Sequence, residues 1–329
     1  MKFDYSQSDL TAATTLRLPF AAAAVCDFLS ESQLKTLAEK IHDFERFFIL
    51  SGGSNSVVLP FFDGLLIRVQ NKGIEIAESD DFFHLNIAAG EKWAAVVRFA
   101  LNCQIFGLES LAGIPGLIGA AAVQNIGAYG SEIADFVEAL EVFDLKEKKH
   151  HVFLKNACDF AYRHSRFKTK DNSFLVFRVK LKIPKKWQYQ SINNARLNLT
   201  PNATPFEVFD CVLKTRAAKL PDPSIFPNAG SFFKNPTVNR KKFSTIQNIL
   251  PNLVFWENGE NFKLSAAFLI ESAGLKGKTL QGFAMSQKHA LVLENKGGSR
   301  ADLDAFVLNI QQIIQQKYGV FLETEPVFM

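Results

Sequence analysis

The chain has 329 residues, of which 47% are hydrophobic and 21% are charged, a balance typical of globular proteins with two or three domains. A formal net charge of +4, with no basic stretch interleaved with stacking aromatics, excludes a surface specialised for nucleic acid. Four cysteines stand far apart without a C-x-x-C pair, so we expect buried free thiols in a reducing compartment. The six histidines form no cluster with ligand spacing, so no metal site is expected.

The N-terminal region carries an apolar run, residues 18–29, that is not a membrane segment. A bilayer span needs about 20 apolar residues, and no cleavage site for a signal peptide follows the run. We expect an interior segment leading into a helix over residues 32–44. The protein is therefore expected to be cytoplasmic.

A glycine-rich turn follows an apolar strand predicted over residues 47–50 and precedes another strand around Val57. Backbone N–H groups of such a turn can approach a phosphate closely. The pattern is neither G-x-G-x-x-G nor a P-loop, and no long helix follows, which excludes a Rossmann domain. The turn consists of Ser51, Gly52, Gly53, Ser54 and Asn55.

The next segments are a predicted helix over residues 91–103 and a long stretch rich in glycine, residues 113–130. The helix should turn Trp93, Val96, Val97 and Ala100 inward. Each glycine costs a helix about 1 kcal/mol relative to alanine, which argues against a core helix in the glycine-rich stretch. We expect this stretch to pass closely along an extended ligand, with its amides directed at phosphates.

The remaining chain alternates predicted strands and helices. Strands are expected near residues 139–144 and 173–183, and the basic residues 146–151, including His150 and His151, should form a turn between strands. Helices are expected near 206–220 and over 301–318, and a strand with two acidic residues over 320–327. The last helix should bury one apolar face, formed by Leu303, Phe306, Val307, Ile310, Ile313 and Ile314.

Residues 227–236 contain a serine, Ser231, with no histidine or charged base in the ten residues around it except Lys234. A serine nucleophile needs a neighbouring base. A hydroxyl on a Gly-Ser turn without one is better suited to donating a proton.

Together these segments resemble the UDP-N-acetylenolpyruvoylglucosamine reductase (MurB) family over nearly the whole chain and in order. The terminal Glu325 also matches. The other motifs that carry the resemblance are residues 51–55, 114–116 with 119–120, 124–130, 162–165, 219–223 and 228–236.

The resemblance implies an α+β fold: a two-subdomain FAD-binding fold of the vanillyl-alcohol-oxidase/PCMH type plus a C-terminal α+β substrate-binding domain. The implied divisions are residues 1–66 for the first FAD-binding subdomain and 67–205 for the second, which the C-terminal strand 318–329 joins. Residues 206–317 would form the substrate-binding domain.

The resemblance also implies the chemistry. NADPH would reduce non-covalently bound FAD, and the enolpyruvyl sugar nucleotide would then take a hydride on C3 and a proton on C2, in peptidoglycan precursor synthesis. Arg163 and Glu325 would stabilise the enolate and Ser231 would donate the proton. Glu325 would have to be protonated or strongly hydrogen-bonded, and a contribution from Glu323 stays open.

Binding residues follow from the same motifs. Lys219, Asn235 and Tyr129 match substrate-side positions. His289 stands where a glutamine helps to bind substrate, and Ser286 where a histidine is usual. Either Tyr189 or Asn194 would replace the family's diphosphate-clamping tyrosine. The cofactor-binding residues implied are Ser51, Gly52, Gly53, Ser54, Asn55, Pro115, Gly116, Gly119, Ala120, Gln124, Asn125, Gly127, Ala128, Tyr129 and Gly130.

Two other functions were considered. A flavoprotein oxidase would often tether FAD through a histidine or cysteine, and neither occurs in residues 51–55 or 113–130. A binding protein without activity would not need Arg163, Ser231 and Glu325 together. We expect a monomeric enzyme that acts on a small molecule and binds neither nucleic acid nor membrane; the motifs do not decide between NADPH and NADH.

Overall fold

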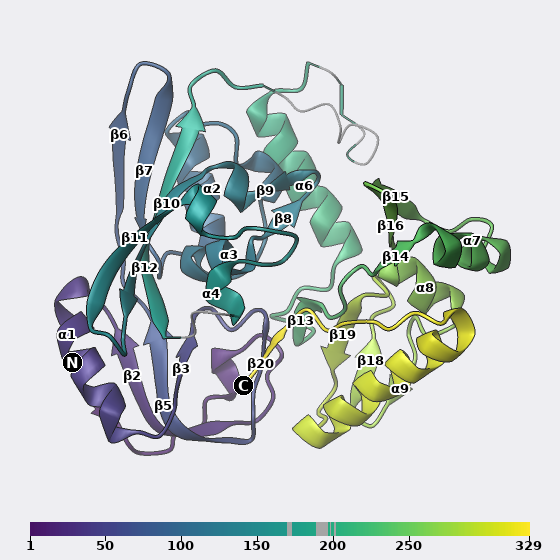
Figure 1. Cartoon of the computed structure of the whole chain (residues 1–329), viewed down its shortest axis with the longest axis horizontal. Coiled ribbons are helices and arrows are strands. Elements are labelled where there is room, and N and C mark those ends of the chain that lie inside the picture. The colour runs from purple at the N-terminus through teal and green to yellow at the C-terminus, as the bar shows by residue number, and fades with distance from the viewer. Residues whose placement is uncertain (170–172, 189–196, 198, 201) are drawn as a thin grey trace. The chain divides into compact units, whose positions relative to one another are not determined.

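The computed structural model (Figure 1) describes residues 1–169, 173–188, 197, 199–200 and 202–329. Tyr189 and Asn194 lie outside the described residues. The chain divides into two compact units. Unit 1 comprises Met1–Ser8, Ala22–Gly52 and Phe61–Arg216, and unit 2 comprises Asp9–Ala21, Gly53–Pro60 and Ala217–Met329.

Unit 1 contains a four-stranded sheet with the order β1-β2-β5-β3. β1 pairs antiparallel with β2, whereas β3 and β5 are parallel, with Phe47 opposite Leu65. The short helix α1 (Leu34–Lys40) precedes β3. The strands are β1 (Phe3–Asp4), β2 (Ala21–Phe28), β5 (Phe61–Val69) and β3 (Phe47–Leu50).

The second sheet of unit 1 is a five-stranded antiparallel sheet with the order β11-β10-β12-β7-β6. Figure 1 shows the long strands β7, β10 and β12 beside α2 and α3. The strands are β6 (Ile74–Glu78), β7 (Phe82–Ala88), β10 (Val137–Asp144), β11 (Lys149–Leu154) and β12 (Phe174–Pro184). The helices of this part are α2 (Trp93–Asn102), α3 (Ile118–Gln124), α4 (Arg166–Thr169) and α6 (Pro205–Lys219), with a small hairpin of β8 (Gly127–Ala128) and β9 (Ser131–Glu132).

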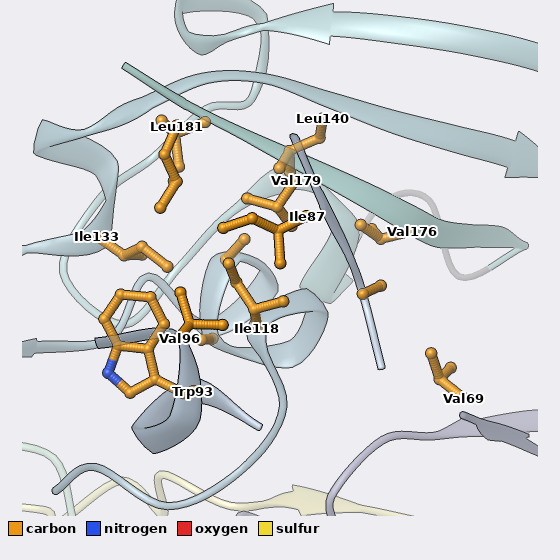
Figure 2. Close-up of a cluster of buried hydrophobic side chains, with 14 of the residues drawn as sticks. Val69, Ile87, Trp93, Val96, Ile118, Ile133, Leu140, Val176, Val179 and Leu181 are labelled. Atoms are coloured by element: carbon orange, nitrogen blue, oxygen red, sulfur yellow. The ribbon is translucent and has the colours of Figure 1, made fainter. Parts of the chain in front are cut away.

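The core of unit 1 forms where α2 and α3 meet the second sheet (Figure 2). Trp93 and Val96 of α2 and Ile118 of α3 are fully buried among residues such as Ile87 and Val179 of the strands. The indole nitrogen of Trp93 donates to the Leu111 carbonyl at 2.9 Å, so its one polar atom is satisfied inside the core.

Unit 2 contains a four-stranded sheet with the order β13-β19-β18-β17 and a three-stranded sheet with the order β14-β16-β15. Near its C-terminus β20 (Val327–Phe328) pairs in parallel with β4 (Ser56–Val57). The helices are α7 (Arg240–Ile249), α8 (Ala266–Ser272) and α9 (Arg300–Tyr318). The other strands are β13 (Asn228–Ser231), β14 (Thr237–Asn239), β15 (Phe255–Asn258), β16 (Asn261–Leu264), β17 (Thr279–Leu280), β18 (Phe283–Met285) and β19 (Val292–Asn295).

Several predicted elements are confirmed. β3 has the predicted bounds, α2 buries all four residues expected to point inward, and α6 lies within one residue of its prediction. α9 buries the predicted face except Ile313, which is half-buried, and adds Tyr318. The helix expected over residues 32–44 is α1 flanked by two 3-10 turns.

The apolar run 18–29 contains the interior strand β2, and the expected helical segment follows it. Four expectations are wrong. The strand expected over residues 320–327 is not continuous: Thr324 forms an isolated bridge with Phe233, and β20 begins only at Val327. The stretch 113–130 does contain a buried helix, α3. His150 and His151 lie in β11, where aromatic neighbours such as Phe143 pack against them, because the turn ends before Lys149. Cys103 is exposed, and only Cys26 and Cys158 of the four free thiols are buried.

The division into three domains, with boundaries at residues 66, 205 and 317, stays a prediction. The two compact units divide the chain differently, because residues 9–21 and 53–60 belong to unit 2. Within the described residues, no helix is both long and apolar enough to cross a membrane. The same residues contain no group of His, Cys, Asp and Glu that could hold a metal ion.

Candidate functional site

The predicted cofactor turn, residues 51–55, begins in unit 1. There the Ser51 hydroxyl oxygen is buried and has no hydrogen-bond partner among the described residues. A Cβ on Gly52 would lie 3.0 Å from the Cα atom of Gly116. Two predicted cofactor segments therefore pack backbone against backbone, and only glycine permits the contact.

The rest of this turn belongs to unit 2. Gly53 has a φ of +60°, and a Cβ there would lie 2.1 Å from the Ala13 carbonyl oxygen. The neighbouring Thr14 hydroxyl is buried without a partner, like that of Ser51. Sequence reasoning missed Thr14, since a single threonine in an irregular stretch carries no signal. Asn55 bonds to the chain end: its side chain donates to the Glu325 carbonyl at 3.4 Å, and its own carbonyl accepts from Val327 at 2.9 Å.

α3 begins just after the Gly113–Gly116 turn and is fixed by backbone bonds to the end of β7 and the loop after it. The Gly119 amide donates to the Ala89 carbonyl at 3.0 Å, and a Cβ on Gly119 would lie 2.7 Å from the Cβ of Ala89. Gly119 is thus required by close packing inside unit 1. Ala120 is half-buried on the same helix, and Pro115 is exposed in the turn before it.

Asn125 ends α3 in a left-handed conformation, with φ +47°, and is fully buried. Its side-chain amide donates to Glu132 at 2.7 Å and to the Ala161 carbonyl at 2.9 Å, while its oxygen accepts from Ala134 at 3.2 Å. Both ends of the amide are therefore used within the protein. Any contact of Asn125 with a cofactor would come from its backbone.

Tyr129 and Gly130 form the two-residue turn of the β8–β9 hairpin. Their φ values are +49° and +80°, as in type I′ turns, where both central residues have positive φ. A tyrosine is unfavourable in this conformation, and such strain concentrates at functional sites. Gly127 and Ala128, also predicted for the cofactor, form β8.

Arg163 lies in a second tight turn, closed by mutual backbone hydrogen bonds between Ala161 and His164, and has a φ of +54°. Its guanidinium donates to the Gly127 carbonyl at 2.8 Å and to the Asn125 carbonyl at 3.4 Å. A Cβ on Gly127 would lie 3.2 Å from the guanidinium, so this glycine makes room for it. Carbonyl oxygens orient a guanidinium without neutralising its charge.

These features of unit 1 fit a flavin dinucleotide. A buried hydroxyl without a partner, glycine backbones that are approachable, and a positioned cation match the polar and anionic groups of such a cofactor. Ser51, Gly52, Gly116 and the hairpin at Tyr129 are the residues of this unit that would hold it.

Ser231 ends β13 in unit 2, directly after Gly230, whose φ is +71°. The Asn228 side chain fixes this turn, accepting from the Gly230 amide at 2.9 Å and donating to the Phe226 carbonyl at 2.6 Å. Ser231 is half-buried, and its hydroxyl makes no hydrogen bond to any residue that the structure describes. No described side chain that could act as a base is therefore hydrogen-bonded to this hydroxyl.

Glu325 lies on a segment hydrogen-bonded to the residues after Ser231: its amide donates to the Phe232 carbonyl at 2.9 Å. This pairing fixes the backbone positions of Glu323 and Glu325, the two acidic residues considered for the site. Glu323 is exposed and forms an ion pair with Lys234 at 3.0 Å. Its carboxylate thus already has a cationic partner.

The predicted substrate-binding residues of unit 2 are Lys219 and Asn235, at positions expected to contact the diphosphate, and His289. The Asn235 oxygen accepts from the Ala266 amide at the start of α8 at 3.0 Å, and its amide N–H groups make no hydrogen bond to the described residues. Burial lowers the pKa of His289, and the charges of Lys276 and Lys219 lower it further. The ammonium groups are those of Lys219 and Lys276, and the neutral donors are those of Asn235 and His289. Groups of these two kinds are suited to binding an anionic ligand.

Arg163 lies in unit 1, whereas Ser231, Glu325, Asn235 and His289 lie in unit 2. The structure brings Ser231 close to Glu325 in the chain pairing of unit 2, and Arg163 to Gly127 and Tyr162 in unit 1.

Comparisons with known proteins decide the family. Residues 22–152 match the model of an FAD binding domain, and residues 222–329 match the C-terminal domain of UDP-N-acetylenolpyruvoylglucosamine reductase. The reductase of Shewanella baltica is 39% identical over 313 residues, 94% of this chain and 89% of that protein. The reductase of Pseudoalteromonas translucida is 39% identical over 93% of this chain and 92% of its own length. The chain belongs to the UDP-N-acetylenolpyruvoylglucosamine reductase family.

The crystal structure of the reductase from Thermus caldophilus has a similar fold, with a TM-score of 0.69 over 99% of both chains at 23% identity. These matches confirm the predicted family and the α+β fold with an FAD-binding part and a C-terminal domain. They also confirm the reductase activity and FAD as cofactor. The roles of individual site residues stay predictions.

Proposed function

We propose that this chain catalyses the NADPH-dependent reduction of UDP-N-acetylglucosamine enolpyruvate to UDP-N-acetylmuramate, a step of peptidoglycan precursor synthesis, as a cytoplasmic monomer. FAD, when bound, supplies the hydride that reaches C3 of the enolpyruvyl group. The protein must then hold the negative charge that develops on C2 and the carboxylate, and deliver a proton to C2.

The observation that supports this proposal most strongly is the environment of Ser231. Its hydroxyl is hydrogen-bonded to no base among the described residues, and it follows a glycine with positive φ at the end of β13. Such a group donates a proton more readily than it attacks a carbonyl. After its proton has passed to C2, the serine would recover one from solvent.

Arg163 and Glu325 would act on the carboxylate side. The backbone carbonyls of Asn125 and Gly127 orient the Arg163 guanidinium. Its planar fork suits a carboxylate better than an ammonium would. Glu325 is positioned by its backbone bond to Phe232, next in sequence to the proton donor.

Lys219, Asn235 and His289 would bind the diphosphate of the nucleotide. Lys219 contributes a charge, and Asn235 contributes donor N–H groups whose orientation is fixed because its oxygen is bound to α8. Tyr129 would contact the substrate from the β8–β9 hairpin of unit 1.

The test separates the two half-reactions. Purified protein with FAD is reduced anaerobically by NADPH, then mixed with the enolpyruvyl substrate while flavin absorbance is followed. The wild type should be reduced and then reoxidised. In Ser231→Ala, NADPH should still reduce the flavin at an unchanged rate, whereas reoxidation should slow about 10²-fold or more, the usual contribution of a positioned acid.

The matched control is Ser224→Ala, because Ser224 is an exposed serine seven residues earlier whose hydroxyl bonds only to Asp222. It should behave as the wild type in both half-reactions. If the wild-type flavin is not reoxidised by the substrate, the proposed function is wrong. If Ser231→Ala slows both half-reactions equally, Ser231 maintains the structure and is not the proton donor.

A further inference from the structure

The strand β20 lies next to a residue of the proposed site and is only weakly paired. Its sheet has two strands, β20 and β4, and two residue pairs, Val327 with Ser56 and Phe328 with Val57. A two-stranded sheet of this size is marginally stable by itself. Glu325 lies two residues before β20. Further contacts must therefore hold β20 if Glu325 is to keep a fixed position.

The backbone of Glu325 is hydrogen-bonded to two parts of the proposed site in unit 2. Its amide donates to the Phe232 carbonyl at 2.9 Å, and Phe232 follows the proposed proton donor Ser231 directly. Its carbonyl accepts from the Asn55 side chain at 3.4 Å, and the Asn55 carbonyl accepts from Val327 at 2.9 Å. Glu325 thus connects the predicted cofactor turn with the Ser231 segment, and a shift of β20 would move it relative to both.

Arg300, the first residue of α9, contacts both strands of this small sheet. Its Nη1 group donates to the Val58 carbonyl, directly after β4, at 3.1 Å. Its Cζ atom lies over the Phe328 ring of β20, 5.1 Å from the ring centre. A guanidinium is attracted to the face of an aromatic ring, and the attraction is stronger where water is partly excluded. The Arg300 side chain is only 17% exposed, so its contacts hold β20 against β4.

The position of Arg300 is fixed by the start of α9. Ser299 and Asp302 form a capping box there, which determines where Arg300 leaves the helix. The Nε atom of Arg300 donates to Asp304, one turn later, at 3.0 Å. The guanidinium is therefore oriented by its own helix before it meets the two strands.

The Phe328 ring also contacts the residue beside Ser231. It packs edge-to-face against Phe232, with 6.4 Å between the ring centres, and Phe232 is fully buried. Arg300, Phe328 and Phe232 thus form a continuous series of contacts from α9 to the neighbour of the proposed proton donor.

We propose that Arg300 is a positioning residue for the reductase reaction, because it holds β20 against β4 and thereby fixes Glu325 relative to Ser231. Its loss should slow the half-reaction in which these two residues act, since a misplacement of about 1 Å can cost ~10²-fold in rate. Substrate binding should change little, because Lys219 lies on α6 and Asn235 is bound to α8. The inference rests on the proposed function, which gives Glu325 and Ser231 their roles.

Three variants perturb the contact in different ways. Arg300→Met keeps the apolar stem and removes the guanidinium. Arg300→Lys keeps a cation that can lie over the Phe328 ring but removes the planar fork. Phe328→Leu keeps an apolar side chain on β20 and removes the ring.

The matched control is Arg240→Met. Arg240 is also the first residue of a helix of unit 2, α7, and its guanidinium also lies over a phenylalanine ring, that of Phe262, at 5.3 Å. Phe262 belongs to β16, which is in a different sheet from β20. The control therefore removes the same kind of contact without affecting the strand next to Glu325.

The measurement compares the two half-reactions of the FAD-loaded full chain. Each protein is reduced anaerobically by NADPH and then mixed with increasing concentrations of the enolpyruvyl nucleotide. The rate of reduction and the dissociation constant of the nucleotide should stay within about threefold of the wild type in every variant. The reoxidation rate at saturating nucleotide should fall roughly tenfold or more in Arg300→Met and Phe328→Leu, and by a smaller factor in Arg300→Lys.

Two further measurements separate positioning from stability. The thermal midpoint is determined for each variant, because a residue that only stabilised the fold would lower the midpoint and leave the reoxidation rate of the folded protein unchanged. The double variant Arg300→Met with Phe328→Leu should be about as slow as the slower single variant, since both changes break the same contact.

Reoxidation rates within about twofold of the wild type in Arg300→Met and Phe328→Leu would overturn the inference, and so would equal slowing in Arg240→Met. If Arg300→Met does not fold, Arg300→Lys and Phe328→Leu provide the same comparison. Either result differs from failure of the proposed function, in which the wild type itself would not be reoxidised by the enolpyruvyl nucleotide.

Discussion

The surroundings of His289 favour its neutral form, and burial is the largest cause. The Leu291 amide donates to its Nδ1 atom at 3.2 Å, so the neutral ring carries its proton on Nε2. Adding a second proton would have to displace that hydrogen bond. Burial, followed by the charges of Lys276 and Lys219, lowers the pKa of His289, and Glu271 opposes them. A neutral Nε2–H donor offers a ligand what the amide of the family's glutamine would offer.

The lowered pKa of His289 predicts a pH dependence of stability. The unfolded chain takes up a proton near pH 6.5 and the folded chain only at lower pH, so the unfolded state binds more protons in between. The free energy of unfolding should therefore rise with pH through this window. His289→Gln should reduce that rise. Urea unfolding of both proteins between pH 5 and pH 7.5 checks this, and an identical slope for both would contradict it.

At the scale of the element, a glycine can be required for two reasons that the sequence alone does not distinguish. One is a left-handed backbone conformation, and the other is the close approach of a neighbouring segment. Gly53 and Gly259 have φ values of +60° and +59°, so both are in the left-handed region. A Cβ on Gly53 would lie 2.1 Å from a backbone oxygen, whereas a Cβ on Gly259 would meet nothing within 4 Å. Gly259 is therefore required for conformation alone, and Gly53 also for close approach.

This pair gives a matched prediction. Gly259→Ala should lower the free energy of unfolding by about 1–2 kcal/mol, the cost of the left-handed conformation. Gly53→Ala should cost clearly more, because the backbone carrying Ala13 and Thr14 must also move. Denaturant unfolding of the two variants measures the difference. Equal losses would mean that the turn relaxes freely around the added methyl group.

The same distinction shows what the sequence could predict. α2 and α9 were predicted because a regular apolar period specifies which face is buried. The local sequence does not predict α3, because its glycines lower the helix propensity of the stretch. In the structure Gly119 is required where α3 meets Ala89, a long-range contact that no local pattern encodes.

The candidate site divides in the same way. Ser231 and Arg163 lie in motifs with distinctive local sequence; the structure places Ser231 at the end of β13 and Arg163 in a tight turn. Thr14 has no motif, and its significance arises from a buried hydroxyl without a hydrogen-bond partner among the described residues, which depends on segments far away in sequence. Long-range packing therefore determines the part of the site that the sequence could not predict.

At the scale of the whole molecule, unit 2 is not contiguous in sequence. Residues 9–21 and 53–60 belong to it together with Ala217–Met329. The buried Asn295 side chain donates to the Leu16 and Arg17 carbonyls at 3.0 and 3.2 Å. The Asn228 amide donates to the Thr15 carbonyl, and the Thr15 hydroxyl donates to the Asn228 carbonyl. Arg300 donates to the Val58 carbonyl, and β20 pairs with β4.

The dependence of unit 2 on these two N-terminal segments predicts that residues 217–329 alone do not fold stably. Each buried polar group left without its partner costs about 1–3 kcal/mol, and three or four such losses approach the 5–15 kcal/mol by which a domain is stable. The fragment should therefore melt without a cooperative transition by circular dichroism. Co-expression with residues 1–216, which carry Thr15, Leu16 and Val58, should restore a cooperative transition in the copurified pair. A cooperative melt of the isolated fragment near the midpoint of the full chain would show that the N-terminal segments contribute little to unit 2.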